Sequence, residues 1–176
     1  MLRKLITLTM KYVFAFLGAA FALVASVQAA SYRVETVVTG LVHPWSLAFL
    51  PDSRMLVTER PGRLRVIEPG PDGLIQLRPD PVAGVPPVLA RGQAGLFDMV
   101  LDPEFVNNRR VLLSFAHGTP ESNHLRVVSA KFDGRQLQDV RPIFTSRPAK
   151  SDTQHFGGRM AWLTDGTLLF GMGDGN

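Results

Sequence analysis

Beyond the first thirty residues, the chain consists of short apolar runs separated by turns rich in Pro, Gly, Asp and Asn. Apolar runs at 46–50 and 55–58 flank a Pro-Asp-Ser-Arg turn, and residues 64–67 alternate between apolar and polar positions. This period of two is typical of a half-buried strand, and the turn residues suit it because Pro presets φ while Gly and Asp tolerate left-handed angles. No stretch of a dozen residues keeps helical spacing. The pattern predicts a meander of antiparallel strands.

The same arrangement recurs along the chain. A second unit has apolar runs at 96–101, 111–115 and 124–130, and a third unit has runs at 158–163 and 168–170. The first turn of each unit contains an aspartate, and these turn aspartates lie 50 and 63 residues apart: Asp52, Asp102 and Asp165. Units of short strands at this spacing are typical of β-propeller blades. The sequence therefore predicts an all-β propeller, with a β-sandwich as the alternative.

The first 29 residues have a different composition. Three basic residues and no acidic residue precede a mostly apolar run at 12–27, and Val27-Gln28-Ala29 offers small residues of the kind a signal peptidase reads. The apolar run is shorter than the ~20 residues that span a bilayer. We predict a signal peptide at 1–29 that is cleaved after Ala29, hence a periplasmic or secreted protein without a stable membrane anchor. An uncleaved anchor helix is the alternative.

The length after the leader limits the fold. Residues 30–176 are 147 in number, which corresponds to roughly three blades of about 40–50 residues. Propellers close with about four to eight blades, and an unclosed propeller leaves a long strand edge exposed. We therefore expect residues 30–176 to be the N-terminal part of a longer propeller domain.

Charge, cysteine content and missing motifs exclude several function classes. Of the 19 basic residues, Arg3, Lys4 and Lys11 lie in the leader, which leaves 16 against 15 acidic residues and a net charge of +1. Nothing in this balance favours nucleic acid. The absence of cysteine removes thiolate metal sites and cysteine nucleophiles. The chain has no Gly-x-Ser-x-Gly, P-loop or Gly-x-Gly-x-x-Gly motif, so hydrolase elbows and nucleotide-binding folds have no support.

One histidine has the setting of a reactive side chain. His155 follows a polar loop and precedes Gly157 and Gly158, where missing side chains let a ligand approach closely. Loops before the innermost strands of a propeller converge on its channel, and a neutral imidazole there can accept a proton near pH 7. A loop histidine bonded to the backbone is the alternative. Gln93 holds the equivalent place one repeat earlier, so we expect both residues on one rim of the channel.

The remaining candidates point to structural roles. No two of the four histidines have the spacing of a metal site, and His43, His117 and His124 are expected at surface positions. The three turn aspartates are expected to act only in turns. The sequence assigns no role to Asp98 or Asp174, and it predicts no metal ligand within this chain.

Several motifs follow one another in order along the chain. They are His-Pro-Trp-Ser-Leu-Ala-Phe-Leu-Pro-Asp at 43–52, Val-Thr-Glu-Arg-Pro-Gly-Arg-Leu at 57–64, Gly-Gln-Ala-Gly-Leu-Phe-Asp at 92–98, Leu-Asp-Pro-Glu-Phe at 101–105, His-Phe-Gly-Gly-Arg at 155–159 and Gly-Asp at 173–174. Together they resemble secreted PQQ-dependent aldose sugar dehydrogenases of the glucose/sorbosone dehydrogenase family. The similarity runs from about Tyr32 to Asp174.

The resemblance implies a six-bladed propeller that binds pyrroloquinoline quinone (PQQ) and calcium. In such enzymes a histidine takes the proton of the sugar C1 hydroxyl while hydride passes to the quinone, which gives the lactone and, later, electrons for an acceptor. His155 matches that base by its motif. Gln93 matches a glutamine that contacts the substrate beside the cofactor, and Gln154 falls where the soluble glucose enzyme has a substrate-contacting aspartate.

The resemblance also limits what this stretch is expected to do alone. In the family, the cationic residues that hold the quinone and the calcium ligands come from later blades. A cofactor with three carboxylates needs cations to offset its charge. We therefore expect this chain by itself neither to bind PQQ tightly nor to oxidise an aldose. A non-catalytic propeller fragment or binding module is the rival, and a propeller lactonase would need a cluster of acidic metal ligands that the sequence does not show.

Overall fold

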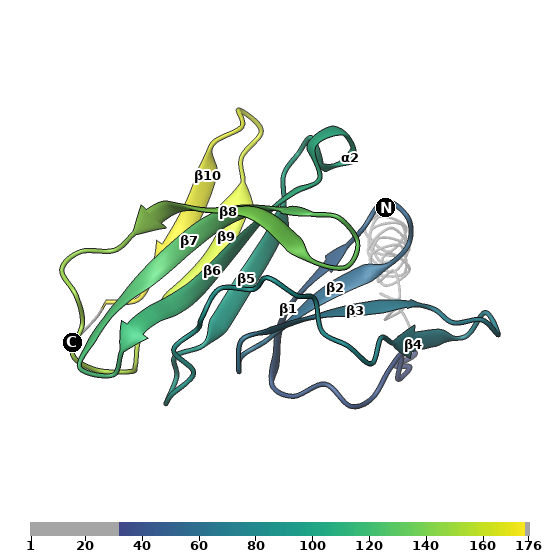
Figure 1. The fold of residues 1–176 in the computed structure, drawn as a ribbon, viewed down its shortest axis with the longest axis horizontal. Helices are drawn as coiled ribbons and strands as arrows, with labels where there is room; N and C mark the ends of the chain where they lie inside the picture. Colours follow the sequence, from purple (N-terminus) through teal and green to yellow (C-terminus); the bar gives the residue numbers. More distant parts are fainter. Residues whose placement is uncertain (1–31, 175–176) are drawn as a thin grey trace, which may run out of the picture. The chain divides into compact units, whose positions relative to one another are not determined.

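The computed structural model describes residues 32–174, and the predicted signal peptide at 1–29 lies outside these residues. Residues 32–35 belong to a separate N-terminal unit, in which Arg33 Nε and Glu35 Oε1 form an exposed ion pair at 2.8 Å. Residues 36–174 form antiparallel strands in three sheets (Figure 1). In the described range, no helix is long and apolar enough to cross a membrane.

Each sheet is a meander of consecutive strands. The first has the order β1-β2-β3-β4, with bounds Pro44–Phe49, Met55–Glu59, Arg63–Pro69 and Ile75–Leu77. The second has the order β5-β6-β7-β8, with bounds Leu96–Leu101, Arg110–Thr119, Ser122–Phe132 and Leu137–Thr145. The third pairs β9 (Gly157–Trp162) with β10 (Leu168–Met172), and α2 (Phe105–Asn108) is a single turn between β5 and β6.

The first strands of the three sheets are neighbours, because β5 contacts both β1 and β9. In Figure 1 the colours pass in chain order from the blue first sheet, through the teal and green second sheet, to the yellow β9 and β10. The predicted low-helix, all-β class is confirmed. The structure adds β4 and β8 as outer strands that the sequence does not mark. Both are mostly exposed, and β8 contains Pro142, a residue that is tolerated on an outer strand.

The second sheet is apolar on both faces because it lies between two others. Leu113 and Val111 belong to a core that also contains Leu56 and Val66 of the first sheet. The alternate residue Leu112 instead packs with Val127 and Met160 in a core shared with the third sheet. Successive side chains of a strand point to opposite faces, so β6 needs an unbroken apolar run rather than an alternating one.

The three turn aspartates have the predicted role. The Oδ1 atoms of Asp52, Asp102 and Asp165 each accept a hydrogen bond from the backbone N–H two residues later, at 3.2, 2.8 and 2.8 Å. This bond imitates a backbone turn and explains why aspartate recurs at equivalent places.

Asp98 on β5 connects all three sheets. The residue is only 2% exposed, and its Oδ1 accepts hydrogen bonds from Ser46 Oγ on β1 at 2.6 Å and from the Met99 N–H at 2.9 Å. Its Oδ2 accepts a hydrogen bond from the Met160 N–H on β9 at 2.7 Å. The Arg159 guanidinium lies 3.7 Å from Oδ1 and supplies an opposite charge. A buried carboxylate with three donors is well satisfied.

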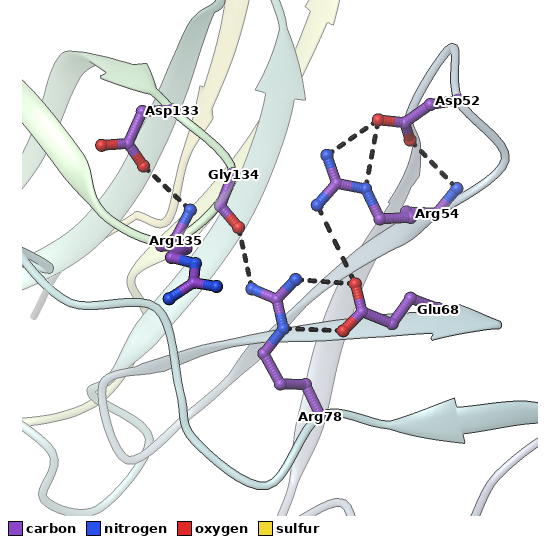
Figure 2. A network of polar contacts seen from close by, with 7 residues as sticks. All are labelled: Asp52, Arg54, Glu68, Arg78, Asp133, Gly134 and Arg135. Carbon is purple, nitrogen blue, oxygen red and sulfur yellow. Dashed lines mark hydrogen bonds and ion pairs between the residues drawn. The ribbon is translucent and has the colours of Figure 1, made fainter. Parts of the chain in front are cut away.

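A second group of charged residues links the first and second sheets (Figure 2). Arg78, just after β4, donates Nε–H and Nη2–H to the two carboxylate oxygens of Glu68 at 2.8 and 2.6 Å. Its Nη1–H reaches Gly134 O in the β7–β8 turn at 2.8 Å. Arg54 binds Asp52 and lies 3.9 Å from Glu68. The hydrogen bonds from Arg78 hold the pKa of Glu68 below its usual value.

Replacing Asp98 with Asn should destabilise the protein. The amide keeps one acceptor but turns its NH₂ group toward a backbone N–H or a hydroxyl, so a buried donor loses its partner. We expect the free energy of unfolding to fall by about 2–3 kcal/mol. Urea unfolding measures this, with Asp165→Asn as the control, since asparagine can still accept the turn bond. Equal midpoints for the two variants would contradict the role of Asp98.

The Arg78–Glu68 contact should contribute stability that depends on pH. The folded-state pKa of Glu68 is lowered, so the contribution is present above the unfolded-state pKa and is lost as the pH falls through the folded-state pKa. Glu68→Gln should cost about 1 kcal/mol at neutral pH and progressively less below about pH 4. Thermal unfolding of both proteins across this range tests it, with the exposed Glu121→Gln as control. A Glu68→Gln deficit that stays constant with pH would refute it.

Candidate active site

The loop before β5 is fixed between the first and third sheets. Arg60 donates from Nη1 to the carbonyls of Gly92 and Ala94 at 2.7 and 3.2 Å, and its own carbonyl accepts the Leu96 N–H at 2.9 Å. Gly92 has a positive φ of 60°, and a Cβ there would lie 2.5 Å from Thr153 Oγ1. Only glycine fits this approach without displacing the loop before β9.

This packing brings Gln93 and His155 into direct contact. The Gln93 N–H donates to Thr153 O at 2.9 Å, and the side-chain Oε1 of Gln93 accepts the His155 N–H at 3.0 Å. The two residues come from loops that are 62 positions apart. The two residues therefore lie together as expected, while their place on a channel rim and their roles stay predictions.

The His155 ring is paired with Asp174. Its Nδ1 lies 3.1 Å from Asp174 Oδ1, and the two side chains are 39% and 82% exposed. A carboxylate has no hydrogen to donate, so it can only accept a hydrogen bond. In the neutral imidazole, this contact places the proton on Nδ1 and leaves the lone pair on Nε2. This arrangement leaves Nε2 as the proton-accepting atom of the site.

Asp174 reaches His155 because β10 pairs with β9. Met172 is opposite Gly157, and the same antiparallel register continued by two residues places 174 opposite 155. The Gly173 N–H donates to Phe156 O at 2.9 Å, and any Cβ at position 173 would collide with His155 O. The residue pattern assigns no role to Asp174, because its contact with His155 depends on the register of β9 and β10, which shifts between Phe170 and Met172.

A cavity of about 300 Å³ opens beside this pair. Its polar lining includes Lys150, His155 and Asp174, and its apolar lining includes Phe156 and Met172. The volume is at the small end of ligand pockets, and an apolar wall with a few polar groups is typical of small-molecule sites. Gln154 is exposed and does not line this cavity, so its predicted substrate contact stays a prediction.

The described residues supply only part of a site for an anionic cofactor. In residues 32–174, no three His, Asp or Glu side chains come together as a metal site. Of the cations that line the cavity, Lys150 is already engaged by the Gln154 and His155 carbonyls, and Arg147 is exposed. These residues do not form the cluster of cations that three carboxylates require. PQQ therefore does not fit this set of residues by itself.

Comparison with known proteins identifies the family. The model of the family described as glucose / sorbosone dehydrogenase matches residues 41–176. The chain belongs to this family. The aldose sugar dehydrogenase YliI of Escherichia coli is 38% identical over 151 residues, which cover 84% of this chain and 39% of that protein.

Solved structures of aldose sugar dehydrogenases have the same fold. The soluble aldose sugar dehydrogenase of Escherichia coli in its apo form matches with a TM-score of 0.73 and 39% identity, over 82% of this chain and 41% of that one. The PQQ-bound aldose sugar dehydrogenase of Streptomyces coelicolor matches with a TM-score of 0.67 and 29% identity, over 82% and 42%. The predicted all-β propeller is confirmed. The chain spans less than half the length of the curated relatives it matches.

Replacing Asp174 with Asn should change the tautomer of His155. The amide NH₂ can donate to Nδ1, which removes the preference for a proton on that atom. Ring ¹⁵N chemical shifts at a pH where the imidazole is neutral report the fraction with protonated Nδ1, and we expect this fraction to fall. Asp72→Asn, at an exposed turn, is the control. An unchanged tautomer ratio would show that Asp174 does not orient the ring.

Proposed function

We propose that this member of the glucose/sorbosone dehydrogenase family takes part in the oxidation of an aldose at its C1 hydroxyl to the lactone. The observation that carries the proposal is the His155 ring at the rim of the cavity, with Nδ1 paired to Asp174 and Nε2 free. Relatives from Escherichia coli and Streptomyces coelicolor that are named as aldose sugar dehydrogenases support the substrate class.

In the proposed reaction, His155 is the general base. The sugar C1 hydroxyl donates its proton to Nε2, and Asp174 stabilises the imidazolium that results because its carboxylate faces Nδ1. Gln93 holds the backbone of His155 by accepting its N–H, which limits the positions that the base can take. The side chain of Gln154 is proposed to contact the sugar from the exposed side of the loop.

The cofactor is proposed from a relative. The Streptomyces coelicolor structure is of a PQQ-bound form. When present, PQQ would supply the acceptor for the C1 hydride, and the family resemblance adds calcium as its metal. Residues outside 32–174 would have to provide the cations and metal ligands, since the described residues do not. An external electron acceptor would then reoxidise the cofactor. The sequence of the first 29 residues supports export to the periplasm or beyond.

Two experiments test the parentage and the activity. Sequencing the DNA downstream of codon 176 shows whether motifs for the quinone and its metal follow. Aldose oxidation can be followed with a dye acceptor, PQQ and Ca²⁺. We expect no robust turnover from residues 30–176 alone. We expect turnover from a longer product that contains motifs for the quinone and its metal. Robust turnover by residues 30–176 would refute the proposed dependence on further residues.

Replacing His155 with Ala should abolish this oxidation in a longer product that oxidises the aldose, called here the sugar-oxidising protein. Removing a general base costs about 10²–10⁴-fold in rate. The kcat with aldose and dye measures the loss, while circular dichroism checks the fold. His117→Gln, in the β6–β7 hairpin, serves as the matched histidine control and should keep wild-type turnover. Full activity of His155→Ala would remove the residue from the mechanism.

A further inference from the structure

His155 has a backbone conformation that its surroundings must maintain. Its φ is +53°, in the left-handed region that residues with a Cβ rarely adopt. Strain of this kind persists only where neighbouring groups fix the flanking peptide units. The N–H on one side of the residue is held by Gln93 Oε1. The carbonyl on the other side therefore needs a partner of its own.

Lys150 provides that partner. Its Nζ donates to His155 O at 3.2 Å and also to Gln154 O, so one ammonium binds two successive carbonyls. The peptide groups before and after the His155 Cα are then both fixed. An ammonium has three donors and can serve both carbonyls at once.

The ammonium itself is held on several sides. The side chain of Lys150 is only 15% exposed, and Nζ lies 4.5 Å from the centre of the Phe156 ring and 3.6 Å from Asp152 Oδ1. The backbone of Lys150 exchanges two hydrogen bonds with fully buried Asn123, at 2.7 and 2.9 Å. A cation over a ring face, with its stem covered, loses the mobility of an ordinary surface lysine.

We propose that Lys150 is a positioning residue that holds His155 in its left-handed conformation and so fixes where the imidazole stands in the cavity. Lys150 acts through the backbone carbonyls and does not touch the reacting atoms. The catalytic consequence rests on the proposed function, whereas the hold on His155 is independent of it. The two parts can therefore fail separately.

The first test needs no substitution. Residues 32–174 contain two lysines, Lys150 and the half-exposed Lys131, which pairs with Asp139 at 3.0 Å. In the full chain, NMR of the lysine NH₃⁺ groups should show slow hydrogen exchange and restricted motion for Lys150, and couplings across the hydrogen bonds to the Gln154 and His155 carbonyls. Lys131 should behave as a mobile surface amine. Equal mobility of the two ammonium groups would overturn the proposal.

The second test uses substitutions read out at His155. Lys150→Met keeps the stem but removes the donors, and it should abolish the strong intraresidue amide–Hα NOE that a positive φ produces. Lys150→Arg offers donors to both carbonyls and should retain much of this signal. Lys131→Met is the matched control and should leave His155 unchanged. A wild-type His155 signal in Lys150→Met, or equal loss in the Met and Arg variants, would overturn the proposal.

The third readout is kinetic. In the sugar-oxidising protein, Lys150→Met should lower kcat by about 10–100-fold with little change in KM, because a displaced base weakens the chemical step more than binding. A change confined to KM would show a substrate contact instead and would refute positioning. If no aldose is oxidised by the wild type, the proposed function fails, and the NMR tests still decide whether Lys150 holds His155.

Discussion

The structure depends on polar contacts that cross from one blade to the next, and Asp98 is the centre of them. Its carboxylate binds Ser46 of the first sheet and the Met160 amide of the third. Neighbouring polar groups extend the connection: Thr58 Oγ1 donates to Phe97 O at 2.6 Å, and Ser114 Oγ donates to Gly158 O at 2.6 Å. Because all these groups are buried, each requires its partner in the adjacent blade. Apolar packing alone would hold the sheets together. These directional hydrogen bonds also fix how far each sheet is shifted along the strands of its neighbour.

The candidate active site depends on this alignment of neighbouring sheets. Gln93 belongs to the loop before one inner strand and His155 to the loop before the next, so their contact requires that the two blades stay in register. An aromatic row also joins the three sheets, in which the Phe97 ring contacts the Trp45 and Phe156 rings at centroid separations of 5.8 and 5.6 Å. The row is large and apolar, which resists sliding of one blade against another. The site is thus built across blades rather than within one.

The sequence predicts the fold better than the site. Strands β2, β3 and β5 lie within a residue or two of their apolar runs, and the turn aspartates behave as expected, because these features depend on local chemistry. The sequence does not predict the outer strands β4 and β8. Most of their residues are exposed, so they lack the apolar runs that mark the other strands. His155 and Gln93 were found through glycines and repeat phase. Asp174 and Lys150 were not, since their importance comes from strand register and from a lysine folded back onto carbonyls, neither of which is a residue pattern.

The exposure of the charged groups explains why so many contacts hold one histidine. The pair of His155 and Asp174 is open to water, and an exposed ion pair contributes little to holding a conformation. Asp174 can therefore select the tautomer of the ring but cannot fix where the residue stands. That position has to come from direct hydrogen bonds to the backbone on both sides of the residue, which Gln93 supplies at the amide and Lys150 at the carbonyl. Orientation of the proton and placement of the base are separate tasks in this site, and different residues perform them.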